Sequence, residues 1–149
     1  MQTATAIPSD LMLHIYKETL IEAPPSIVWE TLIEQCGPGF ESMDGSSMNL
    51  KLEPWPGGRW FRDLGNNTGH LWGHVQVIKP PKLLELNGPM FMSYAAISHV
   101  QYRLTEKGSS TLLGLTHRVL GEMLAEHREG VNKGWEYILA GIKAKASRR

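Results

Sequence analysis

Residues 122–146, EMLAEHREGVNKGWEYILAGIKAKA, form the longest uninterrupted helical pattern in this chain of 149 residues, and they contain no proline. At about 100° per residue, one set of side chains falls within an arc of roughly 120°. This set consists of Leu124, His127, Arg128, Val131, Trp135, Ile138, Leu139 and Ile142. The opposite face carries charged residues such as Glu129, Lys133 and Glu136. A helix with one wide, mainly apolar stripe needs a broad surface to pack against.

The residues before this helix supply a candidate surface. From Met48 onward, apolar and polar side chains alternate between short turn sequences, as expected of antiparallel strands with one buried face. Together with an early segment rich in strand-forming residues, seven strands are expected, at residues 11–21, 48–53, 59–64, 70–79, 83–87, 93–104 and 111–120. The sequence therefore predicts an α+β fold in which a seven-stranded antiparallel sheet curves around the C-terminal helix.

A second, shorter helix is predicted at residues 27–35, after two prolines. Proline suits the first turn of a helix because the amide hydrogen that it lacks would have no partner there. The buried face should consist of Val28, Trp29 and Leu32, and the sequence Gly-Pro-Gly at 37–39 should end the helix. Residues 1–10 are expected to be a loose arm, and residues 1–149 a single domain.

The composition narrows the classes of partner. Fifteen basic residues balance fifteen acidic ones, which argues against a nucleic acid or an anionic membrane as the main partner. The single cysteine, Cys36, excludes an intramolecular disulfide and fits a reducing compartment. The N-terminus does not resemble a signal peptide, and no apolar run approaches the roughly 18 residues of a membrane span. We expect a cytoplasmic protein without a membrane span.

Several candidate site residues lie on the expected inner face of the sheet or helix. The best pocket-lining candidates are Trp60, Tyr102, Trp135 and Leu139, although core packing is the more common role for any one of them. His117 alternates with Leu113 and Leu115, so it should face inward as a buried structural histidine, a ligand contact or a general acid–base. Arg62 is either a buried cation that needs a partner or a solvated surface residue.

The sequence contains no recognisable metal-binding or catalytic motif. His70 and His74 would be about 13 Å apart on a strand, so they could not share an ion. Both are expected to point outward together with Trp72. There is no Gly-x-Ser-x-Gly elbow, phosphate-binding loop or dinucleotide-binding glycine motif. No metal site and no cofactor are predicted, and nothing in the sequence demands catalysis.

Three glycines of the C-terminal helix, Gly130, Gly134 and Gly141, project within roughly 40° of one another. Each costs about 1 kcal/mol relative to alanine in a helix interior, so something should approach the helix closely there. The alternatives are a bend of the helix over the sheet, the early strand–helix corner packing against it, a bound ligand, or a second subunit in a homodimer.

The order of elements and several short motifs resemble those of one known superfamily. The motifs are Ile21-Glu22-Ala23-Pro24-Pro25 with Val28-Trp29, Pro56-Gly57-Gly58-Arg59-Trp60, Gly73-His74-Val75, Pro80-Pro81, Leu113-Gly114-Leu115-Thr116-His117 and Gly134-Trp135. The chain resembles the SRPBCC superfamily (START-like and birch-pollen-allergen-like proteins), and within it the activator-of-heat-shock-ATPase-like group, over residues 12–146. Residues 36–47 depart from it, because they are glycine-rich where relatives usually have a short second helix.

This resemblance implies a helix-grip fold with an internal cavity. Its first implication is the binding of a hydrophobic or amphipathic small molecule by Trp60, Tyr102, His117 and Trp135. A second is an enzyme similar to polyketide cyclases and dehydratases, in which His117 would shuttle a proton while Arg62 or Tyr102 stabilises an enolate. A third is a module that interacts with a heat-shock ATPase.

Overall fold

The computed structural model of the protein describes residues 9–149. Residues 1–8 of the expected loose arm lie outside this range, and Ser9 begins a short 3-10 helix, η1 (Ser9–Leu11). The elements that follow are β1 (Met12–Ile21), α1 (Pro25–Cys36), β2 (Leu50–Leu52), β3 (Arg59–Gly65), β4 (Thr68–Lys79), β5 (Leu83–Gly88), β6 (Ala96–Lys107), β7 (Ser110–Gly121) and α2 (Ala125–Ser147).

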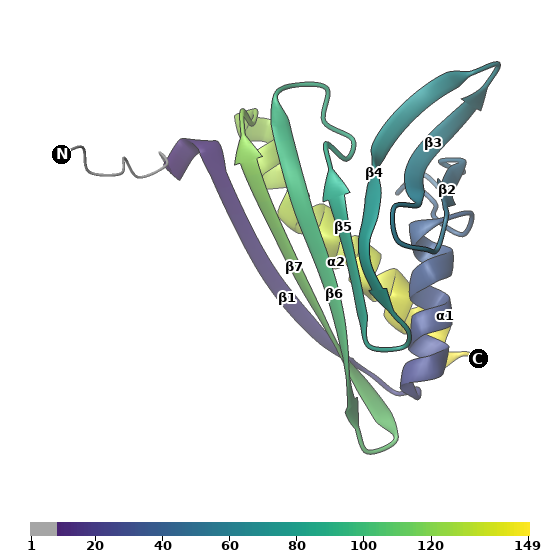
Figure 1. The fold of residues 1–149 in the computed structure, drawn as a ribbon. Helices are drawn as coiled ribbons and strands as arrows, with labels where there is room; N and C mark the ends of the chain where they lie inside the picture. Colours follow the sequence, from purple (N-terminus) through teal and green to yellow (C-terminus); the bar gives the residue numbers. More distant parts are fainter. Residues whose placement is uncertain (1–8) are drawn as a thin grey trace.

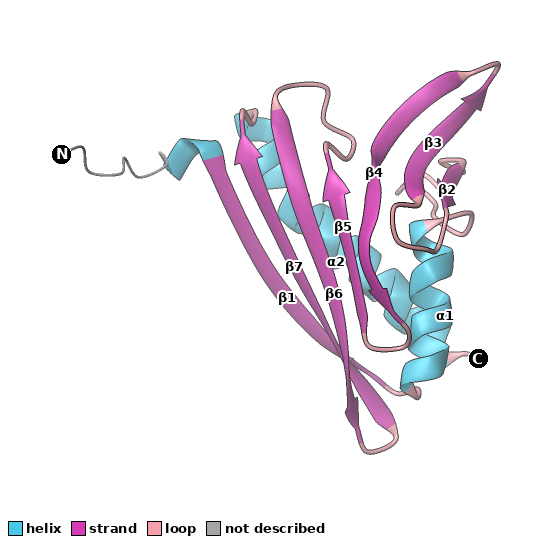
Figure 2. Ribbon diagram, viewed as in Figure 1, coloured by secondary structure: helices cyan, strands magenta, loops and turns pink. Residues whose placement is uncertain are grey.

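The seven strands form one sheet in the order β1-β7-β6-β5-β4-β3-β2, and every neighbouring pair is antiparallel. The long helix α2 crosses behind the strands, and α1 lies beside its C-terminal half (Figure 1). Both helices therefore close one side of a curved sheet (Figure 2). The predicted α+β helix-grip architecture is confirmed.

Helix α1 forms where the sequence predicted it. A proline occupies its first turn, and the helix ends before Gly37. Its buried residues include Val28, Trp29 and Leu32, as predicted. The connector that follows contains no second helix, only an isolated bridge between Glu41 and Ser47. This connector forms one wall of the site described below.

Helix α2 begins slightly later than the sequence pattern suggested. Leu124 is the N-cap residue with extended backbone angles, and its side chain is 58% exposed rather than part of the buried stripe. The rest of the stripe behaves as predicted, because Val131, Trp135, Leu139 and Ile142 are buried. None of the helices in residues 9–149 is long and apolar enough to cross a membrane.

Strand β4 corrects one prediction, because Trp72 points inward. Trp60 pairs with Gly73, but the next residue, Phe61, pairs with Leu71, so Trp72 is an extra residue in a β-bulge. The bulge inverts the alternation beyond it. As a result Trp72 is only 6% exposed, whereas Leu71, predicted to face inward, is 43% exposed.

Candidate functional site

A cavity of about 350 Å³ lies between α2 and the β2–β4 part of the sheet. This size is at the lower end of the range for pockets that bind small molecules. Its walls come from the end of α1, the connector after it, strands β2, β3, β4 and β6, the loop after β5, and the first half of α2. The cavity thus lies in the space between helix and sheet in which a functional site was expected.

Four aromatic side chains line the deep part of the cavity: Trp60, Trp72, Tyr102 and Trp135. They pack edge to face, with 5.2 Å between the ring centroids of Trp60 and Trp72 and 6.1 Å between those of Tyr102 and Trp135. The indole N–H of Trp60 donates a hydrogen bond of 2.7 Å to the carbonyl oxygen of Cys36. The last carbonyls of a helix lack partners within the helix, so this bond satisfies the end of α1 and fixes the Trp60 ring.

His117 lies outside the cavity lining, below the Trp135 ring. The indole N–H of Trp135 donates to Nδ1 of His117 at 2.9 Å, and Nε2 lies 2.9 Å from the hydroxyl oxygen of Ser98. Since Nδ1 accepts, a neutral His117 carries its proton on Nε2 and donates it to Ser98. Burial lowers the pKa of His117 to about 4. The structure therefore places this histidine as a support for Trp135, because β7 directs it beneath the helix and not toward the cavity.

The two titratable groups at the cavity floor are held in their neutral forms. Burial raises the pKa of the Cys36 thiol to about 12. Burial, with the neighbouring Cys36, also raises the pKa of the Tyr102 phenol well above its ordinary value. The floor of the cavity is therefore uncharged at neutral pH, which suits an apolar occupant.

The glycines of α2 separate into two groups. A Cβ atom added to Gly130 or Gly134 would meet no atom within 4 Å, and both residues line the cavity. A Cβ at Gly141 would lie 3.2 Å from Nε2 of Gln35, so this glycine allows α1 to approach α2. An early segment thus packs closely at Gly141, but it is the end of α1 and not the expected strand–helix corner. The other two glycines keep space open in the cavity.

Loops supply the mouth of the cavity. Met43 in the connector is 67% exposed, and Phe91 after β5 is 39% exposed. The loop that carries Phe91 is fastened to α2 by a hydrogen bond of 2.6 Å between the Tyr94 hydroxyl and Nδ1 of His127. The sequence did not predict Met43 and Phe91 as site residues, because single apolar residues in polar connectors show no periodicity. The only available signal was that large apolar side chains occur in loops at all.

Arg62 and Leu139, also predicted as ligand-binding residues, are not part of the cavity lining. Leu139 is core, at 5% exposure. Arg62 lies two residues after Trp60 on β3 and therefore on the same inner face. Its Nε atom is buried without a hydrogen-bond partner, and the same is true of Nε1 of Trp72. A buried donor that lacks an acceptor costs about 1–3 kcal/mol, so these two atoms are unusual.

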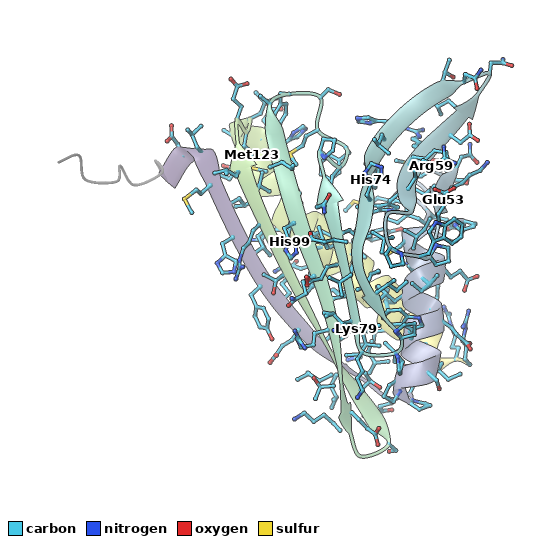
Figure 3. The ribbon with its side chains drawn as sticks, in the orientation of Figure 1. Glu53, Arg59, His74, Lys79, His99 and Met123 are labelled. Carbon is cyan, nitrogen blue, oxygen red and sulfur yellow. The ribbon has the colours of Figure 1, made fainter. Side chains whose placement is uncertain are left out.

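The outer face of the β3–β4 hairpin satisfies its charges internally. Arg59 donates to both carboxylate oxygens of Glu53, at 2.8 and 2.9 Å. Figure 3 shows Glu53, Arg59 and His74 near one another on this hairpin, and Arg59 is the cross-strand partner of His74. In the described part of the chain, no three His, Cys, Asp or Glu side chains gather as a metal site. The outer face thus presents ion pairs rather than a site.

The family model for Activator of Hsp90 ATPase homolog 1-like proteins matches residues 22–146 of the chain. The protein belongs to this family. It is therefore a member of the SRPBCC superfamily, as the sequence motifs indicated.

Solved structures with the same fold share little sequence with this chain. A putative uncharacterized protein from Rhizobium leguminosarum has a TM-score of 0.72 at 15% identity, covering 93% of this chain and 96% of that one. CalU16 from Micromonospora echinospora has a TM-score of 0.63 at 24% identity, with 90% and 76% covered. Ara h 8.0201 has a TM-score of 0.72 at 9% identity, with 93% and 99% covered. No match was found among curated proteins. At these identities the structural likeness shows the fold alone.

Proposed function

We propose that this member of the Activator of Hsp90 ATPase homolog 1-like family binds an apolar or amphipathic small molecule in the cavity beneath α2. The observation that carries the proposal is a cavity of about 350 Å³ whose lining is dominated by aromatic and aliphatic side chains. The site consists of Trp60, Trp72, Tyr102 and Trp135 at the floor, with Gly130 and Gly134 leaving room along the helix. Pockets of this size and lining bind small molecules by burying their apolar surface.

The two alternatives from the sequence have less support. A cyclase-like or dehydratase-like enzyme needs a titratable group that faces the substrate. His117 is not part of the lining, and both of its ring nitrogens are instead hydrogen-bonded to the protein side chains of Trp135 and Ser98. An outward-facing Trp72 would have favoured an ATPase-interaction module, but this side chain is buried. Binding is therefore the function that we propose, in the cytoplasm, where a free buried cysteine such as Cys36 stays reduced.

A second subunit was one alternative for what lies against the glycines of α2, and we propose the ligand instead. Gly130 and Gly134 face the cavity, so a molecule in the cavity can use the space that they leave. The homodimer stays a prediction, and sedimentation velocity of the purified protein would test it.

The proposal predicts that Gly134→Leu abolishes ligand binding without unfolding the protein. The leucine side chain would enter open space in the cavity and occupy part of the ligand volume. Native mass spectrometry of freshly purified protein would reveal a co-purified molecule. Titration with the apolar dye phenylnaphthylamine would give the Kd of the dye. We expect no measurable dye binding by the variant, because the leucine side chain fills space that the ligand needs.

A matched control is Ala140→Leu, which adds similar bulk on the exposed side of the same helix. It should leave dye binding unchanged. Failure of the wild-type protein to bind the dye or any co-purified molecule would contradict the proposal, as would equal binding by wild type and Gly134→Leu.

A further inference from the structure

The inner face of the β3–β4 hairpin carries two buried donors without acceptors, Nε of Arg62 and Nε1 of Trp72. The Trp72 side chain is only 6% exposed, and it lines the cavity. Arg62 pairs across the strands with Leu50, which lines the same cavity. Both donors therefore belong to the hairpin side of the cavity and its immediate border.

The strand register makes Arg62 and Trp72 near neighbours along β3 and β4. Arg62 pairs directly with His70 on β4. Trp72 is two residues beyond His70, which makes it a diagonal neighbour of Arg62 at roughly 7–8 Å between Cα atoms. Arginine and tryptophan side chains are long enough to converge over such a distance. One acceptor group can thus serve both.

Arg62 also lacks a counter-charge. The two carboxylates nearest to it in sequence are Asp63 on β3 and Glu53 just after β2. Both are used elsewhere, because Asp63 pairs with Lys51 at 2.8 Å and Glu53 pairs with Arg59 at 2.8 Å. Both pairs lie on the outer face of the hairpin. Within residues 9–149, no acidic side chain forms an ion pair with Arg62 at 4.0 Å or less. A half-buried cation in this position attracts an anionic group.

We propose that the natural ligand is a carboxylic acid with an apolar body, whose carboxylate lies against Arg62 and Trp72. This inference rests on the proposed function and specifies the ligand class. A carboxylate carries two acceptor oxygens, so it satisfies the Nε–H of Arg62 and the Nε1–H of Trp72 together and neutralises the guanidinium. A neutral acceptor would leave the charge unpaired. The apolar body then occupies the aromatic part of the cavity toward Tyr102 and Trp135.

The test compares two probes that differ only at the polar end, decanoate and decanol, by isothermal titration calorimetry at about pH 8, where the carboxylate is ionised. The wild-type protein should bind decanoate roughly tenfold or more tighter than decanol, as expected for a charge-assisted hydrogen bond. Arg62→Met should bring this ratio close to one. Trp72→Phe, which keeps an aromatic ring but removes the N–H, should lower the ratio severalfold.

Lys51→Met is the matched control, because it removes an exposed cation from the neighbouring strand on the outer face. It should leave the ratio unchanged. Arg62→Lys retains the charge without the Nε donor, and it keeps the test valid if Arg62→Met does not fold.

The outcomes separate the two proposals. Equal affinity of the wild-type protein for decanoate and decanol, with both lost in Gly134→Leu, would overturn the carboxylate inference and leave the proposed function in place. A preference for decanoate that persists in both Arg62 variants would also overturn it. Binding of neither probe, in a protein that also carries no co-purified molecule, would overturn both proposals.

Discussion

His117 shows what one buried side chain contributes at the scale of the residue. It connects the sheet to α2, since it accepts a hydrogen bond from Trp135 and contacts Ser98 on β6. With no measurable exposure it has no water to stabilise a positive charge, so the neutral form is the one that the fold accommodates. The residue that the sequence marked as the best catalytic candidate thus acts as a structural connection.

This arrangement predicts how stability depends on pH. The folded-state pKa of His117 is about 4, below the ordinary value of 6.5. The contribution of the neutral His117 to the free energy of unfolding is therefore fully present above pH 6.5. It is lost as the pH falls toward 4, because the unfolded chain binds the proton first. The loss amounts to roughly 3 kcal/mol over this range.

The measurement is chemical unfolding of wild type and His117→Gln across this pH range. Glutamine can accept from Trp135 and donate to Ser98 but cannot become charged. The free energy of unfolding of the wild type should fall more steeply toward low pH than that of the variant. Parallel curves for the two proteins would show that His117 is not the group responsible.

At the scale of the element, the bulge in β4 decides which side chains reach the cavity. Without the extra residue, Trp72 would point outward and Leu71 inward, as simple alternation predicted. Next to the bulge, β4 and β5 approach each other closely, since a Cβ at Gly73 would overlap the carbonyl oxygen of Asn87. Only glycine permits this approach.

Gly73→Ala should therefore lower the free energy of unfolding by more than about 2 kcal/mol, because backbone atoms must move apart. The matched control is Gly114→Ala on β7, where the nearest atom to an added Cβ is the Tyr16 hydroxyl oxygen at 3.4 Å. The control should change stability by less than about 0.5 kcal/mol. Urea unfolding of both variants measures this difference, and similar values for the two would argue against the close approach at Gly73.

At the scale of the whole molecule, an internal cavity makes stability depend on its occupant. Helix α2 contacts α1 and β1 around a space that the protein does not fill. A molecule that binds only the folded state stabilises it by mass action, by about 2.7 kcal/mol at a free concentration of about 100 times Kd.

Saturating phenylnaphthylamine should accordingly raise the Tm by roughly 5–10 °C for a chain of this length. Differential scanning calorimetry measures the shift. Ala140→Leu should show the same shift as the wild type, whereas Gly134→Leu should show almost none. A full shift in Gly134→Leu would mean that the dye binds elsewhere.

The architecture follows from patterns in the sequence alone. Periodicity of 3.6 residues in 122–146, alternation after Met48, and prolines and glycines at the element ends are local signals, because they follow from backbone geometry and burial of one face. These signals gave seven strands, two helices and an inward His117, and the motifs gave the superfamily. They also brought forward Trp60, Tyr102 and Trp135 as candidate residues, and all three line the cavity.

The composition of the cavity wall, in contrast, depends on tertiary contacts. The inward turn of Trp72 depends on a bulge, which is set by the pairing between β3 and β4 and not by the sequence of either strand alone. The place of Phe91 and Met43 at the mouth depends on where two loops meet α2. The missing acceptors of Arg62 and Trp72 become visible only when every neighbouring polar group has been placed, because satisfaction of a hydrogen bond is a property of the whole packed molecule.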